Sequence, residues 1–192
     1  MCFTLQKERT MKFSRTTLLG DLKTQVNAAT GKVHDFKQLT REKLNFKKSP
    51  ESWSILECIE HLNLYGDFYL PEIERQILAA PKSPMAETFK SGWLGNYFAN
   101  SMLPKDGKVN KMKTFKKMNP ANSQLPLTTI DRFLKQQEHL LTLLRLAETV
   151  DLTKTTTGIT LTSLLRFRLG DTFRFFINHI ERHVLQAERV LQ

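Results

Sequence analysis

The sequence is poor in cysteine, with only Cys2 and Cys58 among 192 residues. One lies at the extreme terminus and the other lies within a helical pattern, so they form no disulfide framework and suit a reducing compartment. A chain of this length buries roughly 70% of its unfolded surface and needs no covalent staples. We therefore expect a single globular domain, located in the cytoplasm.

Long hydrophobic runs are also lacking. No window approaches the ~20 apolar residues that cross a bilayer, which predicts no membrane partner. Residues 1–20 interleave charged and apolar residues and contain no uninterrupted apolar segment of the kind that a signal peptide needs. We assign residues 1–13 to an N-terminal extension and residues 14–192 to the domain, and both Met1 and Met11 remain candidate starts.

Glycine and proline are few, and they gather between segments of helical periodicity. No strict alternation bounded by hairpin turns is present, which argues against a sheet. The sequence thus predicts an all-α four-helix bundle with a long crossover, residues 81–126, between the second and third helices. The expected helices span about residues 14–44, with a possible division near Thr40, then about 54–80, 128–150 and 170–192.

Local signals refine this outline. Ser54 and Glu57 have the spacing of a capping box, and Asp171 after Gly170 resembles an N-cap. Pro71 predicts a kink or break in the second helix. Residues 93–98 are apolar enough to pack back on the bundle, and residues 161–169 fit either a short helix or an extended crossing.

Histidines provide the strongest functional signal. His179 and His183 are four residues apart in the last helix, which places both imidazoles on one face beside the apolar stripe. In the second helix, His61 shares a face with Trp53 and Glu57. Three inward imidazoles on two helices that can face each other predict a divalent metal site with open positions for water or substrate. The alternative is an incidental histidine pair and a hydrogen-bonded core His61.

Other polar residues allow two interpretations each. Glu57 either assists the metal site or serves only the capping box, and we favour the cap. Arg174 and Arg182 either bind an anionic thiol or, as we prefer, pair with neighbouring acidic residues. Cys58, inside an apolar helix, is interpreted as an inert core residue. The residues expected on the surface are His34, His139, Asn63 and Asp67.

The net charge of +10 raises the question of an anionic partner. Much of the positive charge gathers in the crossover, but no aromatic platform interleaves it and no recognition-helix motif is evident. We interpret this segment as a solvated basic loop and do not expect nucleic acid as a partner. The lysines concerned are Lys105, Lys108, Lys111, Lys113, Lys116 and Lys117.

The motifs together resemble the DinB/YfiT-like superfamily. Trp53–Leu62 is similar to its W-S-x-x-E-x-x-x-H-L segment, and residues 169–189 are similar to its last helix with the H-x2-R-H-x2-Q-A ending. The similarity extends from about Ser14 to Gln192. It implies a four-helix bundle with a divalent ion, usually nickel or zinc, on His61, His179 and His183. It also implies a homodimer, since dimers are common in the family.

The resemblance supports the metal better than it supports a reaction. The family includes thiol transferases that use low-molecular-weight thiols, and also members without known activity. Three functions therefore stay open: a metal-dependent thiol S-transferase or hydrolase acting on a small molecule, a non-catalytic metal- or ligand-binding stress-response protein, and a basic protein associated with nucleic acid.

Overall fold

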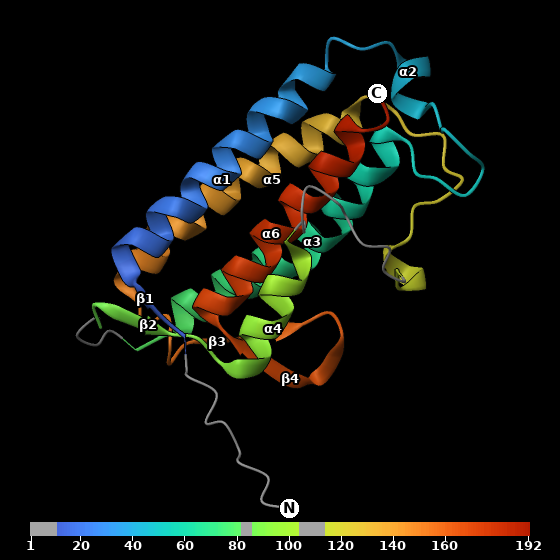
Figure 1. The fold of residues 1–192 in the computed structure, drawn as a ribbon. Coiled ribbons are helices and arrows are strands. Elements are labelled where there is room, and N and C mark those ends of the chain that lie inside the picture. The colour runs from blue at the N-terminus through green and yellow to red at the C-terminus, as the bar shows by residue number, and fades with distance from the viewer. Residues whose placement is uncertain (1–10, 82–85, 104–113) are drawn as a thin grey trace, which may run out of the picture.

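Four long helices form the body of the protein, and the computed structural model describes residues 11–81, 86–103 and 114–192. Helices α1 (Arg15–Phe36) and α3 (Ile55–Ala79) occupy opposite corners, because each of them contacts both α5 (Thr128–Leu146) and α6 (Leu169–Glu188). Figure 1 shows these helices running along one another. The predicted all-α bundle, with its long connection between the second and third long helices, is confirmed.

The predicted capping box at the start of α3 is present. The Ser54 hydroxyl accepts a hydrogen bond from the Glu57 N–H at 3.1 Å, and Glu57 Oε2 accepts one from the Ser54 N–H at 2.9 Å. The helix then continues without interruption through Pro71, so of the predicted kink or break, the break is wrong. Buried residues continue past the proline at Ile73 and Ile77, and this packing offsets the lost backbone hydrogen bond.

Helix α6 begins slightly earlier than predicted. Its N-cap is Arg168, so Asp171 lies in the first turn and the expected Asp171 cap is wrong. The Asp171 carboxylate turns instead to the crossover, where it accepts hydrogen bonds from Ser91 and Gly92. Gly170 allows a close approach, because a Cβ there would lie 2.6 Å from Cε2 of Phe89. Tertiary contacts, rather than local capping, therefore explain why Gly170 and Asp171 occur at these positions.

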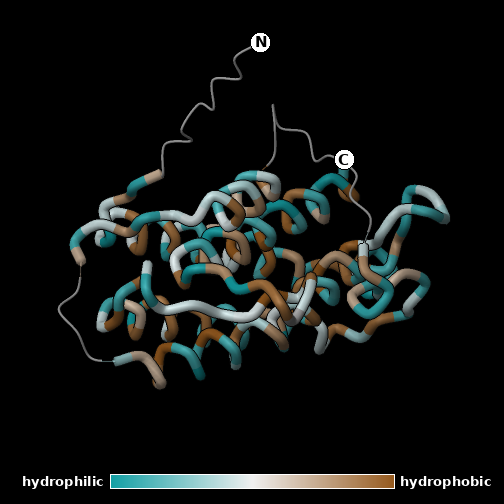
Figure 2. Tube along the Cα trace, turned by 90° about the horizontal axis from the view of Figure 1, so that it is seen from below, coloured by the Kyte–Doolittle hydropathy of each residue, from teal (hydrophilic) through white to brown (hydrophobic). Residues whose placement is uncertain are grey.

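The first predicted helix is divided, as expected, near Thr40. Helix α1 ends at Phe36, and α2 (Arg41–Asn45) starts after Thr40, whose hydroxyl caps it. Directly after α5, the 3-10 helix η2 (Ala147–Thr149) continues the third predicted helix. Figure 2 shows hydrophobic and hydrophilic residues recurring along the helices, and the buried hydrophobic residues of all four long helices form one core.

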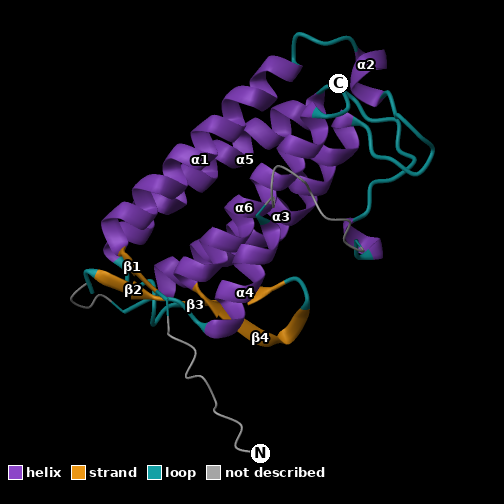
Figure 3. Ribbon diagram, in the orientation of Figure 1, coloured by secondary structure: helices purple, strands orange, loops and turns teal. Residues whose placement is uncertain are grey.

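Two small antiparallel sheets contradict the expectation that no sheet is present. Strand β1 (Lys12–Ser14) pairs with β2 (Thr88–Lys90), and β3 (Thr156–Ile159) pairs with β4 (Thr162–Arg168) around a bulge at Gly158 and Ile159. Figure 3 places all four strands at one end of the bundle. Strands β1, β2 and β3, of three or four residues, are too short to show alternation in the sequence, and the seven residues of β4 do not alternate strictly. Of the two alternatives for residues 161–169, the extended one is correct.

The crossover contains structure of its own. Besides β2, it includes α4 (Trp93–Met102), which packs on α6 as residues 93–98 were expected to do, and the 3-10 helix η1 (Lys116–Met118). Lys116 and Lys117 are exposed, whereas Lys105, Lys108, Lys111 and Lys113 lie outside the described residues. Within the described part of the chain, no helix combines the length and hydrophobicity needed to span a membrane.

Candidate metal centre

His61 lies in α3, two turns after the capping box that sets the phase of this helix. Its side chain is buried, with 2% of its surface exposed. The ring nitrogen Nδ1 lies 2.6 Å from the backbone carbonyl oxygen of Met118, in η1. A carbonyl oxygen can only accept, so Nδ1 of His61 carries the proton and donates it. The second ring nitrogen, Nε2, is therefore left with a free lone pair in the neutral imidazole.

His179 and His183 face α3 from the middle of α6, and both are buried. Nδ1 of His183 lies 3.0 Å from the side-chain oxygen Oε1 of Gln186. With Oε1 as the acceptor, Nδ1 of His183 holds the proton, and its Nε2 lone pair is also free. Two of the three rings are thus held in the same tautomer by partners outside the cluster, as is common for metal-binding histidines.

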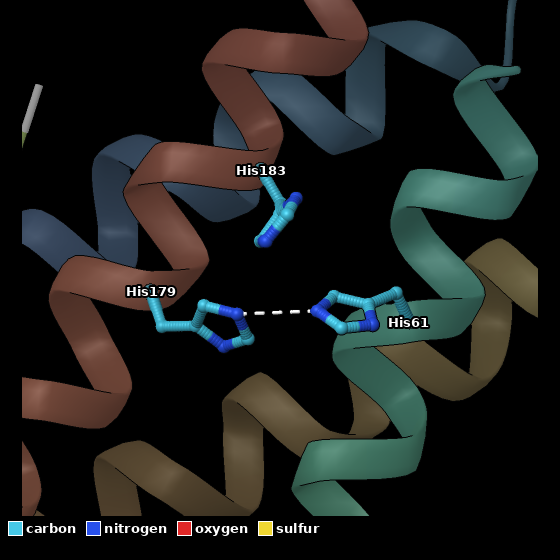
Figure 4. A group of neighbouring side chains, drawn as sticks. All are labelled: His61, His179 and His183. Carbon is cyan, nitrogen blue, oxygen red and sulfur yellow. Dashed lines mark hydrogen bonds between the residues drawn. The ribbon is translucent and has the colours of Figure 1, made fainter. Parts of the chain in front are cut away.

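The three rings converge on one point. Each histidine offers one nitrogen, and these three atoms all lie within 4.8 Å of one another. Nε2 of His61 is 3.2 Å from Nε2 of His179, the contact drawn in Figure 4. Two ligand atoms of a tetrahedral ion with bonds of about 2.0–2.1 Å lie about 3.3 Å apart. The separation of these nitrogens therefore matches that of two ligands of one ion.

His179 has an unusual hydrogen-bonding state. Because Nε2 of His61 has no proton, the short contact between the two rings requires Nε2 of His179 to donate. Its other nitrogen, Nδ1, is buried and has no hydrogen-bond partner among the described residues. A histidine that serves only the core normally has its polar atoms satisfied. His179 is therefore held by packing, and its hydrogen-bonding capacity fits a ligand better than a structural residue.

Aromatic side chains surround the cluster. The ring centroids of Trp53 and His61 are 4.8 Å apart, and those of Tyr65 and His179 are 4.4 Å apart. Phe175 stacks on His179 at 6.0 Å with an interplanar angle of 10°. These rings exclude water from most sides of the three imidazoles. They also restrict how far each imidazole can rotate away from the common point.

Burial keeps the imidazoles neutral. Desolvation lowers the pKa of His61 to about 4, although the hydrogen bond to Met118 opposes this shift. Desolvation, followed by the repulsion of neighbouring positive charge, lowers the pKa of His179 and His183 well below the usual value of 6.5. At neutral pH all three histidines are therefore unprotonated on one nitrogen, which is the form that binds metal.

The donor set itself suits a divalent transition metal. Imidazole nitrogens favour zinc, nickel, copper and iron, whereas magnesium and calcium prefer oxygen ligands. Within the described residues, the group contains three histidines and no carboxylate. Three protein ligands leave at least one coordination position for an exogenous group. In the spacing of His61 and His179, the tautomers of His61 and His183 and the chemistry of the three donors, the residues present fit a single ion.

The other polar candidates of α3 have structural roles. Glu57 is fully buried in the capping box, and Oε1 also pairs with Lys47 at 2.8 Å. Asn63 was expected on the surface, but it is fully buried, because its side-chain amide donates to the Thr129 carbonyl at 3.0 Å and links α3 to α5. Asp67 is exposed, as predicted, and pairs with Arg132.

Of the remaining candidates, Arg182 lies close enough to the cluster for its charge to lower the pKa of His179 and His183, and the others lie away from it or are inert. Arg174 forms an ion pair with Asp171 at 3.2 Å, which agrees with the preferred pairing interpretation, and Arg182 is also buried. Burial raises the pKa of the Cys58 thiol, in keeping with an unreactive core residue. His34 is exposed, and His139 is half-buried and lies 3.5 Å from Glu74.

Sequence reasoning missed the groups that orient the histidines. Gln186 stands in the quoted ending of the last helix, and its position three residues after His183 could have indicated this role. The carbonyl of Met118 had no signal, because any residue supplies a carbonyl and Met118 is 57 residues away from His61 in the chain. Tyr65, one helical turn after His61, was not predicted as part of the site.

Comparison with known families gives one match. The family model described as the DinB superfamily matches residues 27–187, a range that contains all three histidines. Neither a curated protein nor a solved structure matches the chain.

Proposed function

This chain belongs to the DinB superfamily, and from that premise we propose that His61, His179 and His183 hold one divalent metal ion for chemistry on a small molecule. The observation that carries this proposal is the convergence of three neutral, buried imidazoles whose ligand atoms lie within 4.8 Å of one another. Neutral imidazoles gathered without an ion leave buried lone pairs unused, which is unfavourable.

The ion would act as a Lewis acid and lower the pKa of a coordinated water or thiol. The chain supplies the surroundings. Met118 and Gln186 keep His61 and His183 in the metal-binding tautomer. Trp53 and Tyr65 limit access of bulk water. Cys58 contributes no nucleophile, since its thiol is buried and its pKa is raised. We therefore propose that the attacking group is a small molecule rather than this cysteine.

Two reactions follow from this arrangement. In the first, the ion would lower the pKa of a low-molecular-weight thiol, whose sulfur would bond to a small electrophile while the thiol proton leaves with the departing group. In the second, the ion would do the same for water, which would hydrolyse the substrate. We favour the thiol, because a dication held by three neutral ligands without a carboxylate is best neutralised by an anionic ligand. Nickel or zinc is the proposed metal, and a cytoplasmic homodimer is the proposed form of the protein.

A non-catalytic role is the second candidate. Among the described residues, no cysteine, aspartate or glutamate joins the three histidines in the cluster, and Glu57, one turn before His61 in α3, is engaged by Ser54 and Lys47. A cluster without a carboxylate or thiol beside its ligands also suits a metal-binding or ligand-binding stress-response protein. Turnover with a small-molecule thiol distinguishes the two candidates.

The first experiment measures metal in the purified protein by mass spectrometry, before and after reconstitution with Ni²⁺ or Zn²⁺. We expect about one ion per chain in the wild type and in His139→Ala, a matched histidine variant outside the cluster, and none in His61→Ala. Equal metal content in both variants would contradict the proposed ligands. The loaded protein is then assayed with several low-molecular-weight thiols and electrophiles, and sedimentation velocity tests for the dimer.

A further inference from the structure

The end of the crossover lies across the start of α3. We call residues 118–125 the strap. At one end, the Met118 carbonyl accepts the hydrogen bond from Nδ1 of His61 at 2.6 Å. Further along, the Ser123 N–H donates to Oε1 of Glu57 at 3.3 Å. The strap thus touches one of the proposed metal ligands and also the capping box that begins the helix carrying this ligand.

A second anchor holds the strap away from the histidines. Asn45, at the end of α2, forms two hydrogen bonds with the backbone of Leu125: its side-chain nitrogen donates to the carbonyl, and its side-chain oxygen accepts from the N–H, both at 3.1 Å. This paired geometry resembles one rung of a β-ladder. It fixes the backbone of the strap without contacting the cluster.

The tautomer of His61 depends on this docking. If the Met118 carbonyl moves away, Nδ1 of a residue that is 2% exposed loses its acceptor. The ring then either keeps a buried N–H without a partner or shifts the proton to Nε2, the nitrogen that faces His179. The first outcome is costly, and the second blocks the lone pair that a metal requires. Either outcome weakens metal binding.

We propose that docking of the strap on α3 and metal binding by the three histidines are coupled, so that the Met118 carbonyl is a positioning group for His61. This inference rests on the proposed metal site. Coupling is reciprocal: if the docked strap strengthens metal binding, the bound metal must hold the strap in place by the same factor. The crossover is then part of the metal centre rather than a passive connection.

The first test weakens the distant anchor and measures metal affinity. Asn45→Ala removes both hydrogen bonds to Leu125 and leaves the histidines unchanged. Thr40→Ala is the matched control, because it removes the cap of the same helix α2 but no bond to the strap. With Zn²⁺ in competition with a chromogenic chelator, we expect an affinity about 10-fold lower in Asn45→Ala, in the range found for groups that orient metal ligands, and an unchanged affinity in Thr40→Ala.

The second test reads the coupling from the other side. Lys116 and Lys117 are exposed in η1, directly before the strap, and trypsin cleaves after both. We expect saturating Zn²⁺ to slow this cleavage by about 5-fold or more in the full-length wild type. Cleavage after Lys154, whose side chain is 79% exposed in a turn of another part of the chain, is the internal reference for general stabilisation.

The outcomes separate the two proposals. If the wild type binds no Zn²⁺, the metal site and the coupling both fail. If the wild type binds Zn²⁺ but Asn45→Ala has the wild-type affinity, or the metal slows cleavage after Lys154 as much as cleavage after Lys116 and Lys117, the coupling is overturned and the metal site stands. Circular dichroism of both variants verifies that they keep the helical fold.

Discussion

Helix α6 carries two buried polar clusters that differ in how they are completed. In its first turn, Asp171 accepts hydrogen bonds from Ser91, Gly92 and Arg174, and Arg174 donates further to Asn100 at 3.1 Å. Burial raises the pKa of Asp171 and lowers that of Arg174, while the charge of each residue opposes the shift of the other. The groups of this cluster satisfy one another and fasten α4 to α6.

The histidine cluster, in the middle of the same helix, is only partly satisfied, because Nδ1 of His179 has no hydrogen-bond partner among the described residues. Met118 and Gln186 bind the outer nitrogens of two rings, whereas the inner nitrogens face one another. The contrast shows that burial alone does not identify a site. A buried cluster whose charges and hydrogen bonds are internally complete stabilises the fold, and one that leaves a buried ring nitrogen without a partner is suited to a ligand.

The largest expected effect lies in the complete cluster. Asp171→Ala leaves the buried Arg174 without its carboxylate and should lower the free energy of unfolding by about 3–5 kcal/mol, measured by urea denaturation. The double variant D171N/R174M removes both charges and should regain most of that loss. A single variant as stable as the wild type would show that the ion pair is not needed. Any folded Asp171 variant should keep the metal affinity of the wild type.

The open cluster should stabilise the protein only when it is filled. Zn²⁺ at 100 times its Kd is expected to raise the free energy of unfolding by about 2.7 kcal/mol, because the ion binds the folded chain and not the unfolded one. Thermal unfolding with and without the ion measures this effect. His183→Ala should show no such gain. A gain retained in that variant would place the ion elsewhere.

The partners of the outer nitrogens should have a smaller effect. Gln186→Leu removes the acceptor that holds Nδ1 of His183 and should lower metal affinity by about 10- to 100-fold. Gln186→Glu keeps an acceptor at that position and should retain the affinity. The measurement is again chelator competition. If the leucine and glutamate variants bind equally well, orientation by residue 186 does not contribute.

The smallest expected effect is the pH dependence of the metal-free chain. The pKa of His61 is lowered to about 4 in the folded chain, whereas the unfolded chain titrates near 6.5. Between these values the unfolded chain binds more protons, so stability falls as the pH falls, by about 1 kcal/mol for His61 alone between pH 6.5 and 5.5.

Urea denaturation of the metal-free protein at several pH values measures this decline. His139→Ala should show the same slope, because His139 lies outside the cluster. His61→Ala should show a shallower one. A stability that does not change between pH 6.5 and 5.5 would mean that the buried histidines are charged in the folded state.

Much of the fold could be predicted because its signals are local. The capping box of Ser54 and Glu57, the division near Thr40 and the helical periodicity of the long helices all depend on residues within a few positions of one another. Strands β1 and β2 escaped prediction because their pairing joins distant segments, such as Phe13 with Phe89, whereas β3 and β4 form a local hairpin of which only the extended alternative for residues 161–169 was anticipated. Asp171 and Asn63 were misplaced for the same reason, since their partners lie in other elements.

The histidines were found from spacing and periodicity, which place a side chain on a face of its own helix. Their convergence was a separate matter, because the rotation of α3 against α6 depends on the packing of both helices against the rest of the core. The tautomer of His61 could not be predicted from the sequence either, since it depends on a hydrogen bond that forms only when the crossover packs against α3.

The sequence by itself determined which segments are helical, which faces are apolar, and that three imidazoles point inward, because periodicity and capping act over a few residues. Only the tertiary structure decided that those imidazoles meet, that a carbonyl 57 residues from His61 sets its protonation, and that Asp171 fastens the crossover. The physical reason is that hydrogen bonds and metal geometry require positions accurate to a fraction of an ångström, and distant segments reach such positions only in the packed chain.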